Sequence, residues 1–287
     1  FGDAGSLTVP NPIAHTFPVR ELTARGSWSI TNGLIDVPAF KLTLDRPSVE
    51  GGVTARKTGD AFDIDGFVSG AGFAFDDVAK YWPASVAGNP RAWITKHVLS
   101  GAVGNLETKF STRWSPSAGF DLGAVNGTID GNDLVIDYLP PLPKVVKGAT
   151  KATFDQHKFN FTILGGEAAG LVVRSGHIVI SDLDKVDQWT DIDLRIVGPL
   201  KSALTTLDSE PFRFARAVGL SPGAATGDTS TRLKLRFIAE RRLKFDEIKV
   251  SADSVIKGAG LKGIAFGLDL ADSELELAID GAGMDVK

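Results

Sequence analysis

The sequence contains no cysteine, and this absence excludes both disulfide bonds and thiolate metal sites. It also lacks any run of about 18 consecutive apolar residues, the length that a membrane-spanning helix needs. Lysine and arginine (31) nearly balance aspartate and glutamate (35), and neither sign is gathered into a block. Neither a basic patch for nucleic acid nor an acidic disordered arm is therefore expected.

Alternating apolar and polar residues fill most of the chain. Ile192 and Leu194 alternate with charged residues, and Leu233, Leu235 and Phe237 do the same further on. Because successive side chains of a strand point to opposite faces, each such segment has one apolar face and one polar face. Turn signals recur roughly every 8–12 residues, a spacing typical of all-β folds.

The chain is expected to be one elongated fragment of a longer protein, because it opens on Phe1 without an initiator methionine or a leader. Strands are predicted in residues 1–72, 102–198 and 221–287. A pair of short helices is predicted in residues 73–101 and another in residues 199–220. No exact internal repeat is present, although strands and helix pairs alternate along the chain.

Local signals mark the turns. Asn32 and Gly33 form the strongest hairpin signal in the chain. The Asp-Gly-Asn-Asp run at 130–133 also predicts a hairpin, and the Arg-Ser-Gly run at 174–176 predicts a turn.

Other signals mark the helices. An aspartate at 76 or 77 is expected to cap a helix that runs through Trp82, and Asn89 with Pro90 predicts a helix to about Leu99. In the second pair, one helix is predicted to begin at Pro199 and the other to span 211–219.

These patterns predict a mostly β fold. A one-sided antiparallel sheet cannot leave its apolar face in water, and the predicted helices are too few to cover it. The sheet can close on itself, pair as a sandwich, or curl into a trough that something else fills. We expect an elongated, twisted antiparallel sheet curled into a groove, with two short helical pairs.

The apolar positions of the predicted strands are the candidate lining of that groove, although core packing is the alternative for any single residue. They are Phe40, Leu42, Leu44, Phe62, Ile64, Phe110, Phe120, Leu122, Phe159, Phe161, Ile163, Ile192, Leu194, Leu233, Leu235, Phe237, Ile264, Phe266, Leu268, Leu275 and Leu277.

Motifs that carry chemistry are weak here. Residues 258–263 match G-x-G-x-x-G, but a strand pattern follows where a dinucleotide site needs a helix, so a turn or bulge is predicted. Ser254 and Lys257 match S-x-x-K, and residues 57–59 match K-T-G, as in serine β-lactamases. The order of the two motifs is reversed and S-D-N is missing, so coincidence is the better interpretation. The four histidines show no metal-ligand spacing. We predict no catalytic, cofactor-binding or metal-binding residue, and no enzyme.

Several stretches resemble a known family. They are Tyr-Trp-Pro at 81–83, the runs at 89–94 and 99–103, the proline-rich run at 136–143 with 146–149 and Phe154, and the segment 197–204. They resemble the YhdP-like branch of the AsmA-like envelope proteins of Gram-negative bacteria, over roughly residues 70–285.

The resemblance implies a long, groove-shaped β-structure in the periplasm, part of a full-length protein anchored in the inner membrane through a segment absent from this chain. It implies transport of phospholipid, or another acyl-chain lipid, between the inner and outer membranes, and it supplies no catalytic residues or cofactor. Outer-membrane or other envelope proteins are further candidate partners.

Two alternatives to a lipid conduit stay open. One is a structural scaffold that assembles outer-membrane proteins by strand addition at a sheet edge. The other is a carbohydrate-binding or hydrolytic sandwich, which predicts a polar cleft with exposed tryptophan and two carboxylates.

Overall fold

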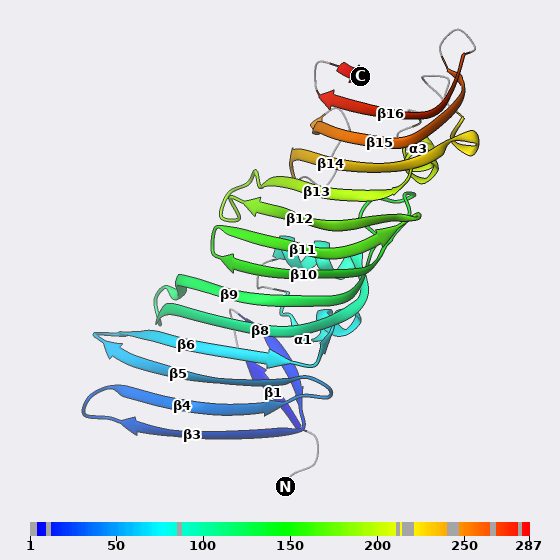
Figure 1. Cartoon of the computed structure of the whole chain (residues 1–287). Helices are drawn as coiled ribbons and strands as arrows, with labels where there is room; N and C mark the ends of the chain where they lie inside the picture. Colours follow the sequence, from blue (N-terminus) through cyan, green and yellow to red (C-terminus); the bar gives the residue numbers. More distant parts are fainter. Residues whose placement is uncertain are drawn as a thin grey trace. The chain divides into compact units, whose positions relative to one another are not determined.

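The computed structural model describes residues 5–9, 13–84, 88–210, 213, 221–239, 247–264, 268–280 and 283–287. One antiparallel sheet of 15 strands follows the chain order, and a separate two-stranded sheet precedes it (Figure 1). The strand path ends at β3 (Glu21–Ser29) and β17 (Gly283–Val286), so the sheet is open. The predicted class, mostly β with an open antiparallel sheet and few short helices, is confirmed.

The chain divides into two compact units. Unit 1 comprises Phe1–Asn132 and Ala152–Gln156, and unit 2 comprises Asp133–Lys151 and His157–Lys287. The strands before the boundary are β1 (Gly5–Val9), β2 (His15–Val19), β3, β4 (Leu34–Thr43), β5 (Ser48–Thr58), β6 (Ala61–Ala71), β7 (Phe73–Ala74) and β8 (Val98–Ser115). Both β9 (Gly119–Ile136) and β10 (Val145–Asp155) contribute residues to each unit. Those beyond are β11 (Lys158–Ala168), β12 (Leu171–Ser181), β13 (Trp189–Pro199), β14 (Thr226–Ile238), β15 (Lys249–Ile264), β16 (Leu268–Asp280) and β17.

The alternating sequence gives strands with one polar face that is more exposed than the other. In β14, the charged residues Arg232, Lys234 and Arg236 are exposed, while Leu233 and Leu235 between them are half-buried. The same alternation continues along β16. Period-2 patterning therefore predicted these strands and their two faces correctly.

The hairpin predicted at Asn32 and Gly33 is confirmed. Strands β3 and β4 pair from Ser29 and Leu34 outward, and Gly33 adopts a φ of +57°. Glycine reaches this left-handed region without the steric cost of a Cβ, which makes the tight connection favourable.

Two predicted turns are wrong. Strand β12 runs unbroken through residues 174–176, and its pairing with β13 shifts between Val173 and Ser175, so Arg174 is the extra residue of a β-bulge. Strand β9 runs unbroken through residues 130–133, where Asp133 adopts a φ of +51°. Glycine and short polar residues serve bulges as well as turns, so local composition does not separate the two.

The G-x-G-x-x-G match lies inside a strand whose pairing is irregular, which agrees with a bulge, one of the two structures predicted there. Strand β15 covers it, and the pairing with β16 shifts at Ile256/Ala259, Ala259/Leu261 and Leu261/Ile264. Gly258 and Gly263 both have a φ of +63°, so the glycines serve irregular strand pairing.

The first predicted helical pair is present. A 3₁₀ turn, η1 (Phe75–Asp77), leads into α1 (Val78–Tyr81), and α2 (Gly88–His97) follows. Helix α2 ends at His97 rather than Leu99, because β8 already begins at Val98.

In the second pair, α3 (Leu200–Asp208) begins after Pro199, and η2 (Pro222–Ala224) precedes β14. The helix predicted over 211–219 lies outside the described residues, apart from Arg213.

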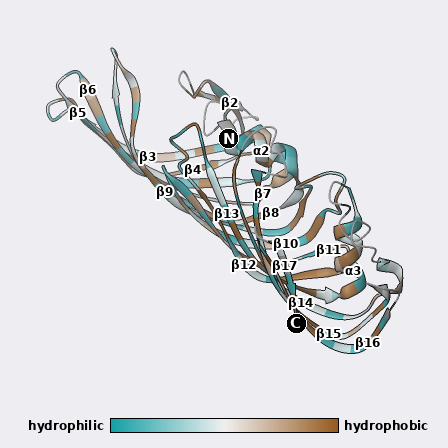
Figure 2. Ribbon diagram, turned by 90° about the horizontal axis from the view of Figure 1, so that it is seen from above, coloured by the Kyte–Doolittle hydropathy of each residue, from teal (hydrophilic) through white to brown (hydrophobic). Residues whose placement is uncertain are grey.

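The buried core of unit 2 gathers around α3. Leu200 packs with Ala225, Ile256 and Ala259, and Leu204 and Leu275 are among the partly buried residues around them. Figure 2 shows α3 on the inner side of the bend formed by β14, β15 and β16. Helix α3 therefore covers only the part of the sheet that it contacts.

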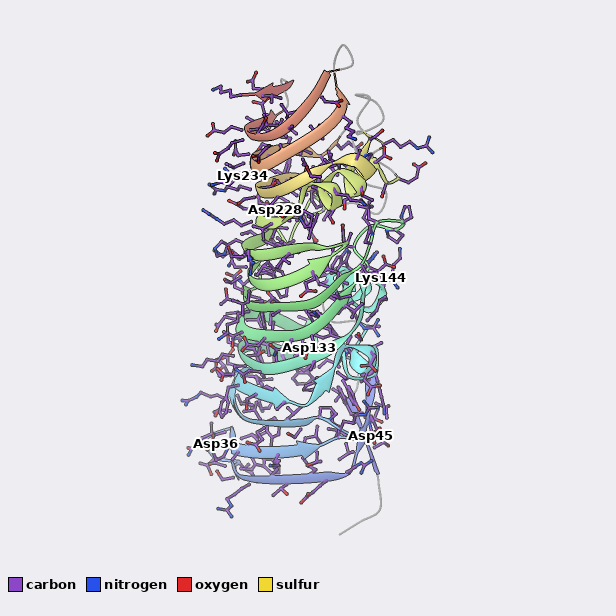
Figure 3. All side chains as sticks on the ribbon, turned by 45° about the vertical axis from the view of Figure 1, so that its right-hand side comes forward. Asp36, Asp45, Asp133, Lys144, Asp228 and Lys234 are labelled. Carbon is purple, nitrogen blue, oxygen red and sulfur yellow. The ribbon has the colours of Figure 1, made fainter. Side chains whose placement is uncertain are left out.

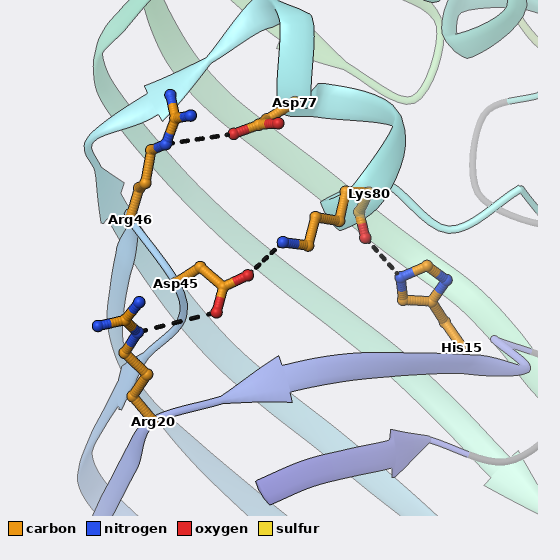
Figure 4. Close-up of polar contacts among 6 residues, drawn as sticks. All are labelled: His15, Arg20, Asp45, Arg46, Asp77 and Lys80. Atoms are coloured by element: carbon orange, nitrogen blue, oxygen red, sulfur yellow. Dashed lines mark hydrogen bonds and ion pairs between the residues drawn. The ribbon is translucent and has the colours of Figure 1, made fainter. Parts of the chain in front are cut away.

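In unit 1, polar contacts join β2, the β4–β5 connection and α1. Asp45 accepts a hydrogen bond from Lys80 Nζ and lies 3.8 Å from Arg20 Nε. His15 Nε2 lies 3.0 Å from the Lys80 carbonyl oxygen, and Figure 4 draws these contacts with a neighbouring ion pair. The hydrogen bond from Lys80 lowers the pKa of the Asp45 carboxyl group from its ordinary value. These side chains are engaged in holding unit 1 together.

Candidate functional site

One side of unit 2 carries rows of apolar side chains that cross neighbouring strands. Phe161 lies opposite Ile178, which lies opposite Ile192, which lies opposite Leu235. Directly opposed residues of antiparallel strands point to the same face, so the row is continuous. We call this side the apolar face of unit 2; it carries Phe159, Phe161, Ile163, Ile178, Ile180, Ile192, Leu194, Ile196, Leu233, Leu235, Phe237, Leu275, Leu277 and Ile279.

All these side chains are half-buried. Neighbouring side chains cover their flanks, and α3 covers the end near Leu275. A closed core would bury such residues almost completely, whereas a solvated polar surface would not place them in rows. The apolar face therefore retains hydrocarbon surface that the described residues of unit 2 do not fully cover.

Three hydroxyl groups interrupt this face near α3. Ser254 Oγ lies 2.7 Å from Thr229 Oγ1 and 2.8 Å from Thr231 Oγ1, and Ser254 and Thr229 are buried. Because these hydroxyls hydrogen-bond to one another, they can lie on an apolar surface at little cost. The S-x-x-K serine is thus a structural residue in this arrangement.

Unit 1 has an apolar face of the same construction. Leu22 lies opposite Leu42, and Leu42 lies opposite Val49; further along, Phe62 lies opposite Trp114. The apolar face of unit 1 carries Leu22, Trp28, Ile35, Val37, Phe40, Leu42, Val49, Val53, Phe62, Ile64, Val68, Leu106, Phe110 and Trp114. At its β3 end, Trp28 is 73% exposed and Leu22 is 53% exposed.

Glycines let phenylalanine rings lie across neighbouring strands. The Phe40 ring covers Gly51, where an added Cβ would lie 2.8 Å from Phe40 Cζ. The Phe110 ring covers Gly66 in the same way, at 2.5 Å from the added Cβ. Both glycines stand directly opposite their phenylalanine, so the rings shield backbone that has no side chain of its own.

Most of the residues predicted to line a groove are on these faces. Ten predicted residues of unit 2 and five of unit 1 (Phe40, Leu42, Phe62, Ile64 and Phe110) are half-buried there. Phe266 lies outside the described residues, and so do the side chains of Ile264 and Leu268.

Three predicted lining residues differ from this group. Leu44 is 2% exposed, at a tight connection where its N–H donates to the Pro47 carbonyl oxygen. Phe120 lies 6.4 Å from the Trp114 ring and is 45% exposed, and Leu122 is 57% exposed.

Several residues of the faces were not in the predicted lining. Ile178 and Ile180 continue the central rows of unit 2, and Leu22 and Trp28 lie on the edge strand of unit 1. The same alternation marks all four, but only the pairing register shows that they share a face with the predicted residues.

The opposite side of unit 2 is charged. Arg232 donates to both Asp193 carboxylate oxygens, with Nε–Oδ1 at 3.0 Å and Nη2–Oδ2 at 2.6 Å. The next row pairs Arg236 with Asp191 at 3.4 Å, and Lys234, labelled in Figure 3, lies on the same side. The hydrogen bonds from Arg232 lower the pKa of Asp193, which therefore stays ionised at neutral pH. We call this side the polar face of unit 2.

The histidines are dispersed. His97 stacks on Trp93 with ring centroids 5.2 Å apart, His157 Nδ1 lies 3.4 Å from Asp184, and His177 stands opposite Asp193. Within the described ranges, no three histidine, aspartate or glutamate side chains are grouped so that they could hold a metal ion. In the same part of the chain, no helix has the length and apolar character needed to cross a membrane.

Comparison with known proteins identifies no relative: no family model, curated protein or solved structure matches this chain.

Proposed function

We propose that this chain forms part of a non-enzymatic conduit that carries phospholipid acyl chains along its apolar faces. The observation that carries the proposal is the continuous cross-strand rows of half-buried apolar side chains, one set in each unit. The resemblance in the sequence supports a setting in the periplasm of a Gram-negative bacterium, between the inner and outer membranes. The same resemblance implies a full-length protein that is anchored in the inner membrane.

The dimensions of unit 2 suit an acyl chain. Strands β11, β12 and β13 each have 11 residues, which span about 37 Å at the rise of an antiparallel strand. One leaflet of a bilayer contributes about 15 Å of hydrocarbon, half of its core thickness. A lipid tail can therefore lie along or across the strands without leaving the apolar face.

The energetics favour a surface of this kind over free diffusion. Each CH₂ group that leaves hydrocarbon for water costs about 0.8 kcal/mol, so a two-tailed lipid rarely crosses water unaided. Rows of Leu, Ile and Phe replace that hydrocarbon without chemistry or cofactor. Since the rows offer no charged group to fix a ligand, binding should be broad and weak at each position, as release requires.

Lipid retention by the purified chain tests the proposal. Native mass spectrometry of the full chain, expressed in a Gram-negative host and gently purified, should show bound phospholipid. Leu235→Glu places a charge in the central row and should reduce the bound lipid at least severalfold. Lys234→Glu, at the adjacent position on the polar face, is the matched control and should retain it.

Circular dichroism of both variants separates loss of lipid binding from loss of fold. A chain that carries no lipid, or a Leu235→Glu variant that is folded and retains as much lipid as the control, would contradict the proposal.

A second candidate function is strand addition to an envelope protein, and β3 favours it. Strand β3 is the edge of the sheet, and its residues from Glu21 to Trp28 are exposed. Its outer edge offers backbone groups on which another chain can pair. Crosslinking from Thr23 that captures an outer-membrane protein, with little lipid on Leu235, would favour this function over the conduit.

A further inference from the structure

The polar face of unit 2 contains two adjoining hollows. One has a volume of about 390 Å³ and the other of about 270 Å³, and Leu164 and Arg174 line both. Strands β11, β12 and β13 supply most of their walls. By their pairing, Ser175, His177, Asp193, Arg195 and Arg232, which line the larger hollow, stand on the polar face.

Guanidinium groups dominate the larger hollow. Arg174, Arg195 and Arg232 line it, together with His177 and a single acid, Asp193. The β-bulge in β12 brings Arg174 into the wall as an extra residue beside Arg195. Bulges are a recurrent means of directing one side chain toward a site.

The positive charge at the hollows is only partly neutralised. Asp193 is engaged by both hydrogen bonds from Arg232, and Glu167 in the smaller hollow pairs with Lys147 at 3.1 Å. The positive charges of Arg174 and Arg195 are not neutralised in this way, because within the described ranges neither residue makes an ion pair. With one acid against three arginines, the larger hollow has an excess of two positive charges.

Like charges also face each other across the strands. Arg195 stands directly opposite Arg232, where side chains are close enough for repulsion to destabilise the pairing. On the next strand, β15, Asp253 stands opposite Arg232, but it does not line the hollow. An anion held between Arg195 and Arg174 would relieve this repulsion.

We propose that this hollow binds the phosphate group of a phosphorylated ligand. Guanidinium forks match phosphate oxygens with paired hydrogen bonds, which makes arginine the preferred side chain for this group. Thr162 and Ser175 line the same hollow and supply two hydroxyl groups that no described residue engages. The phosphate can belong to a small soluble molecule or to a lipid headgroup. The inference does not rest on the conduit, because it concerns the opposite side of the sheet.

The first test measures the affinity of the full chain for inorganic phosphate by calorimetry at low ionic strength. Arg174→Gln and Arg195→Gln should each weaken binding about tenfold, the equivalent of one charge-assisted hydrogen bond. Lys249→Gln removes one exposed positive charge from the same face away from the hollow, so it should change affinity less than twofold.

Arg195→Lys keeps the charge but loses the fork, so its affinity should fall between those of the native chain and Arg195→Gln. Unfolding curves for each variant confirm that binding is compared between folded chains.

Vesicles identify the source of the phosphate. Association with vesicles that contain phosphatidylglycerol, but not with pure phosphatidylcholine, and its loss in Arg195→Gln assign the site to a lipid headgroup. Phosphate binding without vesicle association assigns it to a soluble phosphorylated molecule. The proposal is overturned if neither probe binds, or if Lys249→Gln weakens binding as much as the arginine variants do.

Discussion

At the scale of single residues, unit 1 pairs glycines with phenylalanines across neighbouring strands. Gly51 and Gly66 each stand opposite a phenylalanine whose ring lies over the glycine. A glycine in a strand normally weakens it, because it adds flexibility and packs nothing. Here the ring takes the place of the missing side chain, so the abundance of glycine is compatible with long strands.

Replacing one of these glycines should destabilise unit 1. The added Cβ of Gly51→Ala would lie 2.3 Å from the Phe67 carbonyl oxygen and 2.8 Å from the Phe40 ring. We expect a loss of about 1–3 kcal/mol in the free energy of unfolding, the usual cost of overpacking. Urea unfolding measures it, and Gly5→Ala, with nothing within 4 Å of the added atom, is the control. Equal unfolding midpoints for the two variants would refute the packing account.

The Asp193–Arg232 pair makes a second residue-scale prediction, on pH. Because Arg232 lowers the pKa of Asp193 in the folded state, the carboxylate contributes stability above its unfolded pKa of about 3.9. That contribution is lost as pH falls through the lower folded pKa. Melting temperatures measured from pH 6 down to pH 2 should therefore fall less steeply for Asp193→Asn than for the native chain. Parallel curves would show that the pair adds no stability.

The residues that stand on the apolar faces could largely be predicted from the sequence. Alternation was enough for Phe161, Ile192 and Leu235, because a regular strand fixes which face each residue occupies. It was not enough for Leu44, whose burial comes from the tight connection after β4. The arginine-lined hollow had no signal in the sequence, since it depends on a bulge and on the pairing register of neighbouring strands.

At the scale of elements, α3 covers one end of the apolar face of unit 2. Leu200 is 4% exposed and packs against β15, whereas Leu207 in the same helix is 40% exposed. The helix thus holds one end of the face through a few apolar contacts, and most helical stability in proteins comes from packing of this kind.

Two leucine-to-alanine variants within α3 test this role. Leu200→Ala should lower the free energy of unfolding of unit 2 by about 2–5 kcal/mol, because it leaves a cavity in the buried cluster. Leu207→Ala, the same substitution at an exposed position, should cost much less. Thermal unfolding followed by circular dichroism compares them, and similar losses would show that α3 does not anchor this cluster.

Elements were predicted well where the signal was periodic and poorly where it was local. The strands and the Asn32-Gly33 hairpin follow from period and turn chemistry. The composition of the runs at 130–133 and 174–176 predicts turns, yet both lie within strands. Whether such a run turns the chain or only bulges depends on how the partner strand pairs with it, as β13 does with β12, and local composition does not contain that register.

At the scale of the whole molecule, each unit separates apolar from polar side chains onto opposite sides of its sheet. In unit 2, rows that contain Phe161 and Leu235 lie on one side, and the Asp193–Arg232 pair lies on the other. In unit 1, Phe110 and Lys109 lie on opposite sides, but the separation is less complete, because Phe67 stands opposite Lys109 and is 48% exposed. Among the described residues, few hydrophobic side chains are buried, so most of the apolar side chains on these faces keep part of their surface exposed.

Photocrosslinking at adjacent positions of β11 tests the central claim most directly. Phe161 and Asn160 are neighbours in sequence but face opposite sides of unit 2. Each is replaced in turn by a photoreactive benzoyl-phenylalanine in the full chain, which is expressed in the periplasm and irradiated in intact cells. Mass spectrometry should find phospholipid attached at position 161 and little or none at position 160. Equal labelling of the two positions, or no lipid at position 161 in a folded chain, would contradict the account.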